Sequence, residues 1–144
     1  LLEKYEFGEP EFVRLREAMW MTVFDTAARA GQSLIFTFAP ESTVSSDFPQ
    51  HVAQVIADAG GELKFVRLVV SREEQEHRIA NDSRLQFKKL VSLDLLRALR
   101  PYFAACEAAM PAADLVIDSQ IDDPETAARR IAAASGLPTV STAT

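Results

Sequence analysis

The basic residues between positions 71 and 89 are the strongest chemical feature of the sequence. The segment SREEQEHRIANDSRLQFKK carries Arg72, Arg78, Arg84, Lys88 and Lys89 in a chain of 144 residues whose formal net charge is -6. Arginine suits bidentate contacts to phosphate and stabilises the charge on a transferring phosphoryl group. Because the acidic remainder of the chain repels polyanions, such a contact must be local. The segment therefore favours a small anionic ligand over nucleic acid.

A solvated helix surface is the competing interpretation of the same residues. Arg72 with Glu76, and Glu74 with Arg78, are spaced four residues apart, which is typical of exposed ion pairs on a helix. Arg84 differs, because no acidic residue lies four positions away on either side and it follows the predicted end of the helix. Spacing alone leaves both interpretations open.

Composition limits the class of protein. The content of 48% hydrophobic and 25% charged residues predicts one compact domain over residues 1–137, followed by a flexible tail at 138–144. The single cysteine, Cys106, excludes an internal disulfide framework, and no apolar run is long enough to span a bilayer. We therefore expect a cytoplasmic protein that contacts neither membrane nor nucleic acid. The chain opens with leucine instead of methionine, so we expect an N-terminal portion to be missing.

Strands are predicted to alternate with helices along the chain. Apolar runs indicate strands at 33–39, 63–70 and 114–118, and proline at position 101 is expected to begin a second short helical piece. The spacing of apolar residues predicts a helix over 10–30 whose core-facing side chains are Phe12, Leu15, Met19 and Val23. Alternation of this kind favours a three-layer αβα fold with a parallel sheet. Three strands are few for such a sheet, so one or more N-terminal strands are expected to be absent.

Two stretches of the chain resemble small P-loop kinase-like proteins of the shikimate-kinase and adenylate-kinase type. They are VRLVVSREEQEHRIANDSRLQFKKLVSLDLLRAL and DLVIDSQIDDPETAARRIAA. The resemblance implies a P-loop kinase-like fold, ATP and Mg²⁺ as cofactors, and an unidentified small molecule as phosphoryl acceptor. It also implies that Arg78 and Arg84 are catalytic lid arginines, and that Arg84 and Lys88 contact the nucleotide. The phosphate loop of that family, G-x-x-x-x-G-K-[ST], does not occur in these 144 residues.

The sequence is therefore compatible with two functions. One is an ATP-dependent small-molecule kinase, provided that the full protein supplies the phosphate loop. The other is a non-catalytic module that retains a truncated fold and serves in binding or oligomerisation. The partner in the second case would be another copy of the chain, in a homo-oligomer. Polar residues lie at the end of the first predicted strand and after it, where an enzyme could hold a metal ion or substrate: Thr37, Glu41, Ser42, Thr43 and Asp47. A plain loop is the simpler interpretation.

Overall fold

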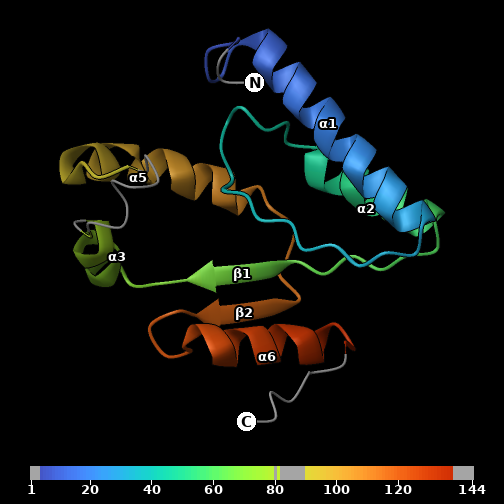
Figure 1. Ribbon diagram of the computed structural model, residues 1–144. Helices are drawn as coiled ribbons and strands as arrows, with labels where there is room; N and C mark the ends of the chain where they lie inside the picture. The colour runs from blue at the N-terminus through green and yellow to red at the C-terminus, as the bar shows by residue number, and fades with distance from the viewer. Residues whose placement is uncertain (1–3, 80, 82–89, 138–144) are drawn as a thin grey trace. The chain divides into compact units, whose positions relative to one another are not determined.

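The computed structural model describes residues 4–79, 81 and 90–137. The elements in these ranges, shown in Figure 1, are α1 (Pro10–Arg29), α2 (Phe48–Asp58), β1 (Val66–Val69), α3 (Arg72–Ile79), α5 (Leu93–Ala108), β2 (Leu115–Asp118) and α6 (Pro124–Ala134).

The chain divides into two compact units. The first combines Leu1–Leu63 with Pro101–Pro111, and the second combines Lys64–Arg100 with Ala112–Thr144. The prediction of a single domain over 1–137 stays a prediction, and the tail at 138–144 lies outside the described residues.

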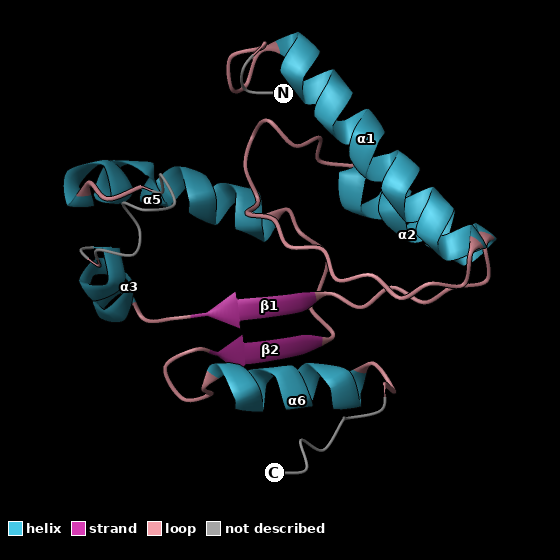
Figure 2. Cartoon of the chain, viewed as in Figure 1, coloured by secondary structure: helices cyan, strands magenta, loops and turns pink. Residues whose placement is uncertain are grey.

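The predicted three-layer αβα fold of P-loop kinase type is wrong. The described ranges hold five helices and a sheet of only two strands, so this part of the chain is mostly helical. β1 and β2 are parallel, with Val66 opposite Leu115 and Val69 opposite Asp118 (Figure 2). The first predicted strand, at 33–39, is irregular. A strand exists only through hydrogen bonds to a neighbouring strand, and 33–39 has none among the described residues.

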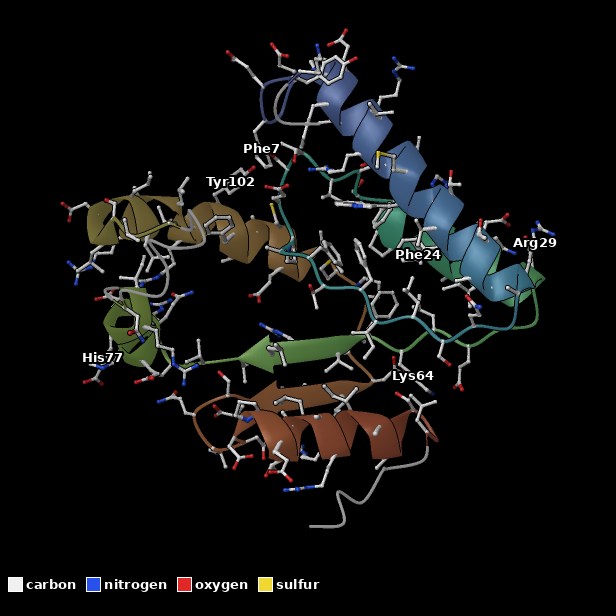
Figure 3. The ribbon with its side chains drawn as sticks, in the orientation of Figure 1. Phe7, Phe24, Arg29, Lys64, His77 and Tyr102 are labelled. Carbon is white, nitrogen blue, oxygen red and sulfur yellow. The ribbon has the colours of Figure 1, made fainter. Side chains whose placement is uncertain are left out.

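Aromatic side chains form the core of the first unit. Phe24, Phe48 and Val52 are each at most 6% exposed, and Figure 3 shows Phe24 on the side of α1 that packs against α2. The ring centroids of Phe24 and Phe36 lie 5.0 Å apart, edge to face. Residues 33–39 therefore contribute aromatic rings to this core although they form no strand.

The prediction of which face of α1 packs into the core was wrong. Of the four expected residues only Phe12 is buried, whereas Leu15, Met19 and Val23 are exposed. The inward side chains instead follow one line at a spacing of four residues: Phe12, Arg16, Trp20 and Phe24. A buried arginine stands in that line, so the periodicity of apolar residues alone pointed to the neighbouring face.

Helix caps and one buried strand residue organise the second unit. The Ser71 hydroxyl accepts a hydrogen bond from the Glu74 amide at 3.2 Å, as the predicted capping pattern requires. The Asp123 carboxylate accepts from the Thr126 amide at 2.7 Å and begins α6. Ile117 of β2 is fully buried, and α6 packs on β2.

Helix α5 runs through Pro101 without interruption, so the predicted break at this residue is wrong. Its start is capped as expected, since the Leu95 amide donates to the Ser92 hydroxyl at 3.2 Å. Proline lacks an N–H and leaves a gap in the helix ladder. The division between the two units falls at this gap, between Arg100 and Pro101.

Candidate functional site

The carboxyl ends of β1 and β2 meet at one edge of the parallel sheet, the usual place for ligands in sheets with helical crossovers. The connections that follow the strands are tied together there. The Ser71 amide donates to Gln120 Oε1 at 2.7 Å, and the Ser119 amide donates to the Val69 carbonyl at 3.0 Å. We call Ser71, Glu74, Arg78, Ser119 and Gln120 the strand-end cluster.

Arg78 is the only cation of the strand-end cluster. It reaches from α3 to the residue after β2: Nη1 donates to Ser119 Oγ at 3.1 Å and Nη2 donates to the Ser119 carbonyl at 2.9 Å. Its Nε donates to Glu74 Oε1 at 2.6 Å. A guanidinium has five N–H donors, so two remain without a partner among the described residues. The side chain is 40% exposed, which leaves these donors accessible to a ligand.

The other residues of the basic segment divide into described and undescribed positions. Arg84 and Lys88 lie outside the described residues, so their predicted contacts with nucleotide stay predictions. The predicted pair of Glu74 with Arg78 is formed. The predicted pair of Arg72 with Glu76 is not found, because Glu76 binds two arginines of α5 instead.

Those two arginines were not identified from the sequence. Arg97 Nη2 lies 2.6 Å from Glu76 Oε2, and Arg100 Nη2 lies 2.8 Å from Glu76 Oε1. Arg100 Nε is buried without a hydrogen-bond partner in the described part of the chain. The spacing RALR, which puts two arginines on one side of a helix, was the available signal. Hydrogen bonds from Arg97 and then Arg100 hold the pKa of the Glu76 carboxyl at about 2.

The ion pairs of Glu76 are expected to persist in mild acid. The folded-state pKa of about 2 lies below the ordinary value of 4.5, so their contribution to stability is complete above pH 4.5 and is lost as the pH falls toward 2. A carbon-detected NMR titration of the Glu76 carboxyl should give a midpoint near 2, and Arg97→Gln should raise it. A midpoint near 4.5 in the unmodified protein would contradict the ion-pair geometry.

A second candidate site lies within the first unit. Loop residues and the start of α1 enclose an open cleft of about 640 Å³ that we call the hydroxyl pocket; it is lined by Gly8, Pro10, Val13, Arg14, Glu17, Ser42, Thr43 and Ser45. The Arg14 guanidinium is exposed and has no partner among the described residues. Three hydroxyls and one available cation suit a polar small molecule that carries an anionic group.

Buried contacts hold the loop of the hydroxyl pocket in place. Arg16, 6% exposed, donates from Nη1 to Glu41 Oε1 at 3.0 Å and to Thr43 Oγ1 at 3.1 Å. The Ser42 amide donates to Tyr102 Oη at 2.9 Å. Glu41, a sequence-based candidate for a metal ligand, is therefore engaged by Arg16 and Thr43.

The Mg²⁺ expected from the resemblance stays a prediction. In the ranges that the structure covers, no three His, Cys, Asp or Glu side chains gather closely enough to hold a metal ion. The two N–H donors of Arg78 that have no partner within the described ranges suit the oxygen atoms of a phosphate group.

Comparisons with known protein families, curated proteins and solved structures find no match to this chain. Among the described helices, none combines the length and apolar character needed to cross a bilayer.

Proposed function

We propose that the strand-end cluster binds the phosphate groups of a nucleotide and that the protein acts as a nucleotide-dependent phosphotransferase. One observation carries the proposal: Arg78 is held at the shared carboxyl edge of β1 and β2, and two of its guanidinium N–H donors have no partner among the described residues. Charge-assisted hydrogen bonds from arginine to phosphate oxygens are short and strong. ATP is the nucleotide that the resemblance to small kinases favours.

The contacts of Arg78 support a role in orienting the phosphate. Glu74 and Ser119 fix three of its N–H donors, so little side-chain freedom is lost when the remaining two meet a ligand. The guanidinium would offset the negative charge that accumulates on a transferring phosphoryl group. We place this activity in the cytoplasm, where a chain with one cysteine needs no disulfide.

Removing the Arg78 guanidinium should weaken nucleotide binding. One charged hydrogen bond contributes about 1.5–3 kcal/mol, so Arg78→Ala is expected to reduce ATP affinity by about 10- to 100-fold in calorimetry. The ATP affinity of Arg78→Lys should lie between those of the unmodified protein and Arg78→Ala, because lysine keeps the charge but lacks the planar fork.

Arg29→Ala is the matched control for the loss of one positive charge. Arg29 forms an exposed ion pair with Asp25 at the end of α1, where Figure 3 labels it. ATP affinity should be unchanged in this variant. Equal affinities for ATP in the unmodified protein and in Arg78→Ala would reject the strand-end cluster as a phosphate site.

A further inference from the structure

Charged side chains, rather than apolar ones, hold helix α3 in the second unit. Of its eight residues only Ile79 is buried. Its half-buried residues are Glu74, Glu76 and Arg78, and the others are exposed. Because a helix with one buried apolar side chain gains little from hydrophobic packing, its position depends on the ion pairs and hydrogen bonds of those three residues.

Glu76 supplies the contact of α3 with α5, and both of its carboxylate oxygens are used. Arg97 Nε donates to Oε1 at 3.1 Å and Arg97 Nη2 donates to Oε2 at 2.6 Å, while Arg100 Nη2 donates to Oε1 at 2.8 Å. A bidentate contact between arginine and a carboxylate fixes the orientation of both groups as well as their distance. The Glu76 and Arg100 side chains are 23% and 24% exposed, so this contact differs from the fully solvated pairs that contribute little.

Glu76 and Arg78 lie on nearly opposite faces of α3, because residues two positions apart are rotated by about 200° around a helix axis. Glu76 faces α5, whereas Arg78 faces the end of β2 and donates to Ser119 Oγ and to the Ser119 carbonyl. The turn that carries both residues is therefore held from two sides. The pair of Glu74 with Arg78 lies within α3 and moves with it, so it cannot replace the contact of Glu76.

We propose that Glu76 is a positioning residue for the strand-end cluster: by tying α3 to Arg97 and Arg100 it keeps the Arg78 guanidinium on Ser119. The inference rests on the proposed function, because it assigns to Arg78 the contact with phosphate. When Glu76 no longer holds α3, the contacts of Arg78 with Ser119 are lost for part of the time, and the side chain has to be ordered when the ligand binds. A residue that never touches the ligand then controls the affinity for it.

Glu76→Gln is expected to weaken ATP binding about 2- to 10-fold in calorimetry, the cost of ordering one long side chain. Charge alone predicts the opposite sign, since the substitution removes a negative charge near a site for an anion. In the Arg78→Ala background the same substitution should not weaken ATP binding further, because the side chain that Glu76 positions is absent. A purely stabilising role of Glu76 predicts no loss of affinity in either background.

Asp122→Asn is the matched control for Glu76→Gln, because it also removes the carboxylate of an ion pair in the second unit. The partner of Asp122 is Arg130, which belongs to α6 and not to α3. ATP affinity should not fall in this variant.

The ligand-free protein gives a second readout that does not depend on ATP. In NMR spectra of the arginine side chains, the hydrogen bonds to Ser119 should slow the rotation of the Arg78 Nη groups, so that their N–H protons give separate signals. Glu76→Gln should average these signals, while the Arg78 Nε–H signal stays displaced by Glu74.

Arg97→Gln is the second variant, and it serves if Glu76→Gln does not fold. It leaves Arg100 on Glu76, so the change in the Arg78 signals should be smaller and in the same direction. Unchanged Arg78 signals in both variants would overturn the proposal. So would an ATP affinity that is unchanged or higher in Glu76→Gln, or an equal loss in the Arg78→Ala background. Failure of the unmodified protein to bind ATP would reject the proposed function alone, and the ligand-free spectra would then decide the positioning role.

Discussion

Phe24→Ala is expected to destabilise the first unit by about 3–5 kcal/mol, the usual cost of removing a buried aromatic ring from a packed core. Phe24 is 6% exposed and lies among Phe36, Phe48 and Val52. Unfolding by urea, followed by the fluorescence of the single tryptophan Trp20, measures the change, because Trp20 belongs to the same cluster.

Met19→Ala is the control for Phe24→Ala on the same helix. Met19 is 51% exposed, so its truncation should change the free energy of unfolding by less than about 0.5 kcal/mol. Alanine favours the helix in both variants, so backbone propensity does not explain a difference between them. A larger effect at Met19 than at Phe24 would restore the face of α1 that periodicity predicted.

Arg16→Met should cost about 2–3 kcal/mol of stability, because it leaves the partly buried Glu41 carboxylate without its cation. The Arg16 guanidinium also donates to the Thr43 carbonyl at 2.5 Å and stacks 4.7 Å from the centre of the Trp20 ring. Arg14→Met, two residues away, should change stability by less than about 0.5 kcal/mol, since Arg14 is exposed and unpartnered within the described ranges.

A double variant distinguishes the lost ion pair from lost packing. Arg16→Met with Glu41→Leu removes both charges, and it should recover part of the stability lost in Arg16→Met alone. Thermal unfolding of the three variants gives the comparison. If Arg16→Met and Arg14→Met had equal effects, the buried arginine would contribute nothing to the loop that it contacts.

Local signals in the sequence identified most of the helices and two strands. The caps at Ser71, Ser92 and Asp123 are recognisable because a hydroxyl or carboxylate three residues before a free amide is a local pattern. The parallel pairing of β1 and β2 follows from the strand–helix alternation between them. Whether residues 33–39 form a strand could not be decided locally, because strand formation depends on a neighbouring strand elsewhere in the structure.

The face of α1 was missed for a related reason. Arg16 counts as polar in a periodicity, yet Glu41 and Thr43 satisfy its charge and the Trp20 ring covers it. Pairing between a helix residue and a loop 25 residues later is a tertiary fact that no local pattern contains. At Pro101 the local signal predicted a break in the helix, because proline lacks an N–H, but α5 continues through this residue.

The candidate site was predicted in part. The resemblance singled out Arg78, which lies at the carboxyl edge of the strands; Arg84 and Lys88 lie outside the described residues. Arg97 and Arg100 were missed because they contact Glu76 across 21 and 24 residues of sequence. The hydroxyl pocket was suggested only by Ser42 and Thr43, and Arg14 was not recognised.

Binding of nucleotide phosphates at the strand-end cluster is the property on which the proposed phosphotransferase function depends. Addition of ATP to isotope-labelled protein, followed by amide NMR spectra, tests it directly. We predict saturable shifts at the amides of Ser71, Ser119 and Gln120, and their loss in Arg78→Ala. Absence of saturable shifts, or shifts confined to residues outside the cluster, would contradict the claim and favour a non-catalytic interaction module.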